Sequence, residues 1–190
     1  VGPRAEAIAR AADPLLLEEA ESYDVDVDLG DGTRLLGTVN SLRGTCLTGI
    51  GYGSLSPRHR LSAWLRLLAL TVTFPNETWQ AVTLGLDRDR TQCARSTLRP
   101  VSAEVAGRLI RQYVALYRDG LRAPIPVSPR SSEAYAVRRS SGTPPQLARS
   151  EAARQWNDAW NVPGEQSDDA HMLLFGAAAP FEVLLREAAR

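Results

Sequence analysis

Lysine is absent from the sequence, in which all 22 basic residues are arginine. Several chemistries depend on a lysine ammonium, either as a compact point charge or as a group whose pKa shifts readily. The absence excludes a Walker-type nucleotide site, a Schiff-base enzyme and a metal-dependent nuclease motif that contains lysine. Arginine is instead suited to binding carboxylates and phosphates.

Cysteine and histidine are scarce, with two of each. Cys46 and Cys93 are too few for a disulfide framework, and the first residues lack the basic segment and apolar run of a secretory signal. We therefore expect a cytoplasmic location. The formal net charge is zero. Because self-sufficient nucleic-acid-binding domains usually have a basic excess, any DNA contact is expected to be local or shared with a partner.

The clearest predicted helix lies between Ser56 and Pro75. Serine is a good N-cap, Pro57 suits the first helical position, and Pro75 prevents continuation. The apolar residues of this segment fall on more than one side, which is typical of a helix buried on several sides. We expect it to be the core helix, with Trp64 in the core.

Patterns on either side of this helix predict a mixed α+β fold. Alternation of apolar and polar residues predicts an antiparallel meander of strands at 22–29, 33–42 and 45–52. Residues 79–86 and 92–98 are expected to form a hairpin after the helix. The sequence therefore predicts a sheet that packs against the core helix.

The remainder is predicted to be mainly helical, within one domain that covers residues 1–190. Residues 1–21 are expected to be a helical lead-in and residues 123–190 a helical C-terminal extension. A helix is expected at 102–119, and a stiff connector follows it at 123–129. Further helices are expected at 132–139, at 146–160, after residue 165 and from residue 180. Trp156 and Trp160 are expected to be core residues.

Three segments contain residue types that are found in metal or phosphate sites, and each has a simpler explanation. Asp24, Asp26 and Asp28 share one face of a predicted strand, but with no histidine nearby a solvated face is favoured over a metal site. In segment 165–171, helix capping is favoured over a metal site at His171. The glycine-rich segment 49–54 lacks the spacing of a phosphate loop, so a turn or close packing is favoured. We therefore expect no catalytic residue, no metal and no cofactor.

The order helix, three-strand meander, core helix and further strand resembles the core shared by restriction-endonuclease-like nucleases. Residues 37–42 resemble the strand in which those nucleases place a metal-binding aspartate, and Asn40 is the residue at this position. Residues 47–55 resemble the next strand, which would carry an acid and a lysine, and neither is present. Two-metal hydrolysis needs carboxylates to hold its cations. The resemblance therefore implies a nuclease-like fold whose active site has been lost.

Four further segments together resemble the C-terminal region of the RecC family, the gamma subunits of exodeoxyribonuclease V, in its actinobacterial form. The segments are 60–70, 120–127, 131–136 and 168–176. They occur in the family's order, and the likeness runs from about residue 30 to the end of the chain.

This resemblance implies a non-catalytic domain of a helicase-nuclease subunit that processes double-strand breaks for recombinational repair. The domain would be a scaffold and DNA-strand guide inside an ATP-dependent complex, with RecB-like and RecD-like subunits and single-stranded or forked DNA as partners. Two alternatives stay open: a protein-interaction module with no DNA contact, and a metal-dependent nuclease with displaced ligands.

Five arginines are candidates for DNA binding. Arg58 and Arg60 are predicted in the first turn of the core helix, where cations oppose the helix dipole, so a ligand such as phosphate would explain them. Arg130, Arg138 and Arg139 follow the Pro-rich connector and would extend this phosphate seat if the fold brings them close. Solvated arginines, or a salt bridge to the acidic first strand, explain the same pattern equally well.

Overall fold

The computed structural model describes residues 2–87, 89–123, 125, 127–160 and 162–187. The chain forms two compact units, Val1–Ala115 and Leu116–Arg190, and each is considered by itself. No helix in the described part of the chain is both long and apolar enough to cross a bilayer.

The first unit is built on a five-stranded mixed sheet with the strands in chain order. The strands are β1 (Glu21–Asp28), β2 (Arg34–Arg43), β3 (Cys46–Ser54), β4 (Gln80–Leu86) and β5 (Cys93–Leu98). Neighbouring strands are antiparallel except for β3 and β4, which are parallel. Helix α2 (Pro57–Thr73) connects this parallel pair, because a parallel connection needs a crossover. The predicted α+β class, meander and hairpin are confirmed.

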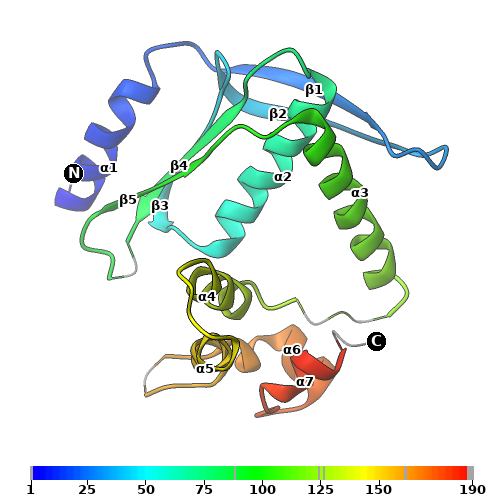
Figure 1. Ribbon diagram of the computed structural model, residues 1–190. Helices are drawn as coiled ribbons and strands as arrows, with labels where there is room; N and C mark the ends of the chain where they lie inside the picture. The colour runs from blue at the N-terminus through cyan, green and yellow to red at the C-terminus, as the bar shows by residue number, and fades with distance from the viewer. Residues whose placement is uncertain (1, 88, 124, 126, 161, 188–190) are drawn as a thin grey trace. The chain divides into compact units, whose positions relative to one another are not determined.

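Helices cover both faces of this sheet (Figure 1). The alternation of β4 separates the two cores, since Ala81 belongs to the cluster on the α2 side while Val82 and Leu84 belong to a smaller cluster with Ala12. Ala12 ends α1 (Pro3–Ala12), which is followed by the short helix η1 (Asp13–Leu15). Helix α3 (Ala103–Gly120) adds buried residues to the α2 side. The sheet is thus the middle of three layers.

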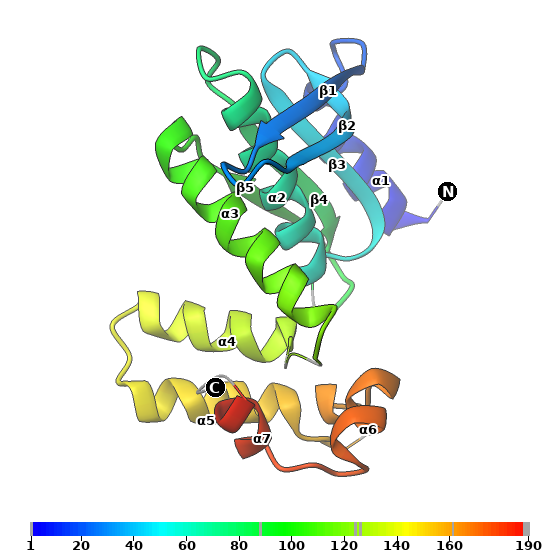
Figure 2. The ribbon, with the colours of Figure 1, turned by 90° about the vertical axis from the view of Figure 1, so that its right-hand side faces the viewer.

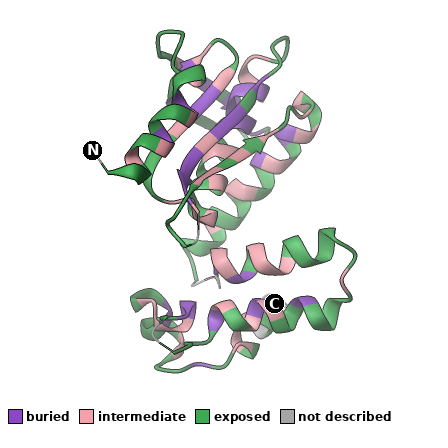
Figure 3. Cartoon of the chain, turned by 90° about the vertical axis from the view of Figure 1, so that its left-hand side faces the viewer, coloured by how far each residue is buried: buried purple, intermediate pink, exposed green. Residues whose placement is uncertain are grey.

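Helix α2 begins and ends where its sequence predicts, but it is buried over only part of its length. The backbone N–H of Ser56 donates to Nδ1 of His59, which closes one half of a capping box. Residues 67–71 are all buried, so the second half is enclosed on every side. In the first half Leu61 and Leu65 are exposed and Trp64 is partly buried against the main cluster. Figure 3 shows that many of the buried residues of this unit lie in the sheet.

The second unit is helical (Figure 2). Its helices are α4 (Pro129–Ser140), α5 (Pro145–Trp156), η2 (Glu165–Ser167), α6 (Asp169–Phe175) and α7 (Glu182–Glu187). Helices α4 and α5 pack side by side. The expected stiff connector at 123–129 includes Pro124 and Pro126, which lie outside the described residues.

Helix α5 is shorter than the sequence predicted. The helix stops at Trp156 because the backbone of Asn157 is extended, at ψ 144°. Trp156 is fully buried, and its indole N–H donates to the carbonyl of Ala179 at 2.7 Å. Trp160 is no longer on the helix and is 92% exposed. The expectation that both tryptophans are core residues is therefore wrong for Trp160.

Candidate functional site

Asn40 lies at an irregularity of β2. The pairing of β1 with β2 shifts between Glu21 and Tyr23, so that two residues of β2, Asn40 and Ser41, lie opposite one residue of β1. Ser41 has a left-handed φ of 66°. Such bulges bend a strand and often occur beside functional sites. The side chain of Asn40 is exposed.

A polar bridge holds β2 to β3 beside this bulge. Thr48 of β3 is buried, and its hydroxyl donates to the carbonyl of Ser41 at 2.9 Å. The guanidinium of Arg43 donates to the same hydroxyl. Strand β3 carries no carboxylate and no basic residue. The bridge between the two strands is therefore formed by a cationic side chain and neutral groups, while the carboxylate of Glu18 lies beside the turn at Gly44.

Asp24 and Asp26 of β1 bond to residues of β2 that are not part of this junction. Asp26 accepts two hydrogen bonds from Arg34, which hold the pKa of this carboxyl below its usual value. Asp24 accepts a hydrogen bond from the hydroxyl of Thr38 at 2.7 Å. Asp24, Asp26 and Asp28 are exposed, as the solvated-face interpretation predicted. The described residues contain no group of three or more His, Cys, Asp or Glu arranged to hold a metal ion.

A pocket of about 290 Å³ opens on the α2 side of the sheet. Its floor comes from β3 and β4, and its wall comes from the first half of α2. The α2 residues that line it are His59, Ser62, Ala63 and Arg66. Sequence reasoning missed this pocket, because it assigned the glycines of 49–54 to a turn or close packing, whereas they lie within β3.

The glycines of β3 leave the floor of the pocket without side chains. Gly49, Gly51 and Gly53 all line the pocket, and the pairing of β3 with β4 is irregular between Ile50 and Ser54. A Cβ at Gly49 would contact the side chain of Thr83, which places Gly49 on the α2 side of β4. Close packing does occur at Gly85, where a Cβ would lie 2.9 Å from the carbonyl of Gly53.

Arg58 and Arg60, the predicted phosphate seat, lie in the first turn of α2 as expected. Arg58 is exposed and Arg60 is partly buried. Neither arginine lines the pocket. The side of α2 that lines it carries His59 and Ser62. Both arginines also interact with other groups of the chain.

The three other candidate arginines belong to the second unit and make local contacts there. Arg130 donates to the carbonyl of Pro163 at 3.1 Å, and its Nε lies 4.0 Å from the carboxylate of Glu165. Arg138 pairs with Glu151 at 3.3 Å. Arg139 donates to the carbonyl of Thr143 at 2.8 Å. One surface formed by all five arginines stays a prediction.

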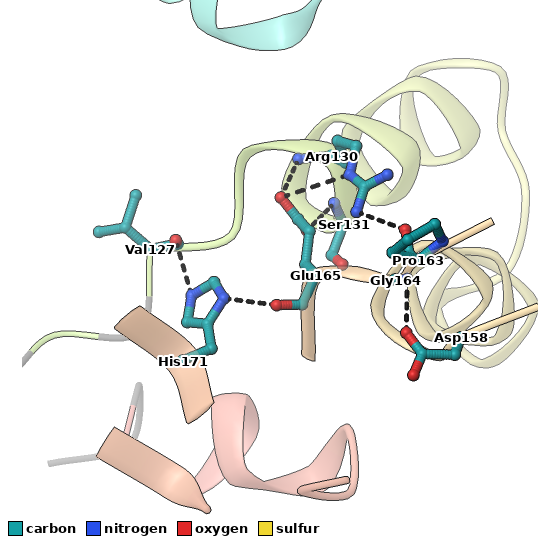
Figure 4. A network of polar contacts seen from close by, with 8 residues as sticks. All are labelled: Val127, Arg130, Ser131, Asp158, Pro163, Gly164, Glu165 and His171. Carbon is teal, nitrogen blue, oxygen red and sulfur yellow. Dashed lines mark hydrogen bonds and ion pairs between the residues drawn. The ribbon is translucent and has the colours of Figure 1, made fainter. Parts of the chain in front are cut away.

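Segment 165–171 is a structural network (Figure 4). Glu165 is buried, and its carboxylate accepts the backbone N–H groups of Arg130 and Ser131, both at 2.8 Å, at the start of α4. The side chain of Asp168 caps α6 by accepting from the backbone N–H of Ala170. The ring nitrogens of His171 lie 2.7 Å from the carbonyl of Glu165 and 3.2 Å from that of Val127. Capping is therefore confirmed at Asp168, while Glu165 caps a different helix.

Proteins of known family are similar to this chain in sequence. The family model "RecC C-terminal domain" matches residues 1–140. The RecBCD enzyme subunit RecC of Mycobacterium tuberculosis (strain ATCC 25618 / H37Rv) is 38% identical over 165 residues, which are 87% of this chain and 15% of the relative. That of Mycolicibacterium smegmatis is 36% identical over 132 residues, which are 67% of this chain and 12% of the relative. The chain thus spans a small part of these relatives, and it belongs to the RecC C-terminal domain family.

Proposed function

We propose that this chain is a nuclease-like, non-catalytic domain of a RecC-type subunit. In this proposal it belongs to a cytoplasmic helicase-nuclease that processes double-strand breaks for recombinational repair, and its partners are RecB-like and RecD-like subunits. The family match and the relatives named RecBCD enzyme subunit RecC support the assignment. The whole chain would be one domain, with residues 123–190 as its helical extension.

The order of elements in the first unit supports a restriction-endonuclease-like core. A helix precedes a three-strand meander, a crossover helix follows β3, and the next strand lies parallel to β3. This is the arrangement that the resemblance to nucleases implied. The proposal concerns the fold alone, because function depends on the side chains at the site.

The composition of the β2–β3 junction is the observation that carries the non-catalytic assignment. A metal-dependent nuclease needs carboxylates that hold divalent cations and stabilise developing charge. The junction instead contains the neutral amide of Asn40, the Thr48 hydroxyl and the guanidinium of Arg43. A fixed cation repels a divalent metal ion, so the junction disfavours metal binding.

The guiding role rests on arginines that contact DNA phosphates. Arg58 and Arg60 are placed at the start of α2, whose first backbone N–H groups favour anions. Because the net charge is zero, the chain alone is expected to bind DNA weakly, with a Kd of roughly 10⁻⁴–10⁻⁶ M that rises steeply with salt. Tight binding would need the partner subunits.

The test is the binding of single-stranded and forked DNA at two salt concentrations. We expect the double variant Arg58→Ala with Arg60→Ala to bind more weakly than wild type at low salt and to depend less on salt. The double variant Arg95→Ala with Arg99→Ala, which removes the same charge around β5, is the matched control. Equal binding by the Arg58/Arg60 variant and wild type would remove the phosphate seat from the proposal.

A protein-interaction module without DNA contact is the second candidate. Two large apolar residues of the second unit are highly exposed, Trp160 at 92% and Leu173 at 86%. Tryptophan is strongly enriched among the residues that dominate protein interfaces. In this case Trp160→Ala should weaken assembly with RecB-like and RecD-like subunits in a pull-down while DNA binding by the chain is undetectable.

A further inference from the structure

We infer that the pocket between α2 and the sheet binds one phosphate group of a DNA strand, with Arg66 as its cationic partner. This inference rests on the proposed function, because it names a contact of the same domain with DNA. The pocket is separate from the Arg58/Arg60 seat, neither residue of which lines it. Its volume of about 290 Å³ is close to the lower bound of small-ligand sites, and a phosphate with its sugar is a ligand of that scale.

The charge of the lining favours an anion. Among the residues that the structure describes, Arg66 is the only arginine that lines the pocket, and no carboxylate lines it. Within the described part of the chain Arg66 has no ion pair. A guanidinium offers a planar set of donors that matches the geometry of phosphate oxygens. The pocket therefore holds a cation whose counter-ion is not supplied by its own walls.

Two further donors share the side of α2 that bears Arg66. His59, Ser62 and Arg66 are spaced so that they follow one stripe of the helix. The Nδ1 of His59 accepts the backbone N–H of Ser56 at 3.1 Å, and a backbone N–H can only donate. The neutral ring therefore carries its hydrogen on Nε2, which remains a donor. With the hydroxyl of Ser62, the wall of the pocket offers three hydrogen-bond donors.

The floor of the pocket permits close approach of a sugar-phosphate backbone. Gly51 and Gly53 of β3 are exposed and line the pocket with main chain where other residues would project side chains, whereas Gly85 of β4 is closely packed against Gly53 and Leu55. A Cβ at Gly53 would meet no atom within 4 Å, so this position opens onto free space. A side chain at position 53 can therefore reduce the room in the pocket without a clash against the backbone.

The first experiment uses inorganic phosphate and follows the histidine ring resonances by NMR. The chain has two histidines, and His171 lies in the second unit, so the His59 signals are readily assigned. We expect a saturable shift of the His59 signals in wild type and none in Arg66→Ala. Arg108→Ala, which removes an exposed arginine of α3, is the matched control and should behave as wild type.

The second experiment measures binding of a labelled oligothymidylate by the same proteins and by Gly53→Val. We expect Arg66→Ala to weaken binding about five- to tenfold at low salt and to lower the salt slope by about 0.7, the value for one phosphate contact on a single strand. Gly53→Val should weaken binding through lost space, with an unchanged thermal melt that shows intact folding. The oligothymidylate should also compete with inorganic phosphate at His59.

The outcomes separate this inference from the proposed function. Phosphate binding at His59 without competition by the oligothymidylate overturns the strand contact and leaves a site for a free phosphate. Oligothymidylate binding that is equal in wild type, Arg66→Ala and Gly53→Val overturns the pocket while DNA guiding survives. If neither probe affects His59, the pocket is not a phosphate site, whatever the result with Arg58 and Arg60.

Discussion

At the scale of single residues, His171 joins parts of the second unit that are far apart in sequence. Its ring lies between the carbonyls of Glu165 and Val127 and packs against Trp156, with the ring centres 5.0 Å apart. Whichever tautomer is present, the ring donates to at least one of these carbonyls. The sequence indicates only a cap or a metal ligand at this position. The contact with Val127 spans 44 residues and leaves no local pattern, so it could not be predicted.

We expect His171→Ala to destabilise the second unit by about 1–3 kcal/mol, since it removes a buried ring and leaves a buried carbonyl without its partner. Chemical denaturation followed by tryptophan fluorescence measures the change. Met172→Ala, the next residue on α6, is more exposed and should change stability much less. Similar effects of the two substitutions would show that the network contributes no specific stability.

Asp158 predicts a pH dependence in the same unit. Hydrogen bonds from the hydroxyl of Ser167 and the backbone N–H of Gly164 hold its pKa below the usual value. Because the folded pKa is depressed, the stabilisation is present above the unfolded pKa of about 3.9 and is lost as the pH falls through the folded pKa.

The unfolding free energy of wild type should therefore fall below about pH 4, and Asp158→Asn should flatten this part of the profile. Denaturation midpoints measured from neutral pH down to pH 2 provide the comparison. The two curves should converge at the acid end. Parallel curves over the whole range would mean that Asp158 is not the titrating group.

At the scale of elements, the ends of α2 and the strands of the meander follow from local rules, and the end of α5 does not. Capping residues, prolines and alternation act within a few neighbours and can be read directly. The helical pattern of α5 continues to Trp160, yet the chain becomes extended at Asn157. Asp158 then accepts from Gly164, so a contact outside the helical pattern fixes the loop.

Trp156 and Trp160 give a matched test of this boundary. Trp156→Ala should cost about 3–5 kcal/mol, because it removes a fully buried large aromatic ring and its hydrogen bond to Ala179. Trp160→Ala should change stability by about 0.5 kcal/mol or less, because its side chain is in solvent. Thermal melts of both variants decide the matter, and a large loss in Trp160→Ala would place the end of the helix beyond residue 160.

The glycines of β3 show another limit of sequence patterns. Their alternation is visible in the sequence, but glycine is more common in turns than inside strands, so a turn was the better local interpretation. Their place on the floor of a pocket beside α2 is visible only once α2 has crossed over to join the parallel strands β3 and β4. The role of Arg66 follows from the same placement, since an arginine inside an apolar helix has no local signature of ligand binding.

At the scale of the whole molecule, the family was recognisable from short segments, and the comparisons confirm it. The α+β class, the meander and the hairpin also followed from periodicity, because half-buried strands alternate clearly. The parallel pairing of β3 with β4, which joins the meander and the hairpin into one sheet, was not predicted. The division into two compact units did not follow, since α3 (Ala103–Gly120) runs through the boundary at Ala115 without a break in its helical pattern. The role of the chain in an assembly depends on partners that the sequence does not contain.

The central claim is that the nuclease-like core does not cleave DNA, and a cleavage assay tests it most directly. The purified chain is incubated with linear single- and double-stranded DNA in magnesium and in manganese, beside Asn40→Ala and Asn40→Asp. We expect no cleavage above background in any of the three, because one restored carboxylate does not replace the acid and lysine missing from β3. Metal-dependent cleavage by wild type that Asn40→Ala abolishes would contradict the account.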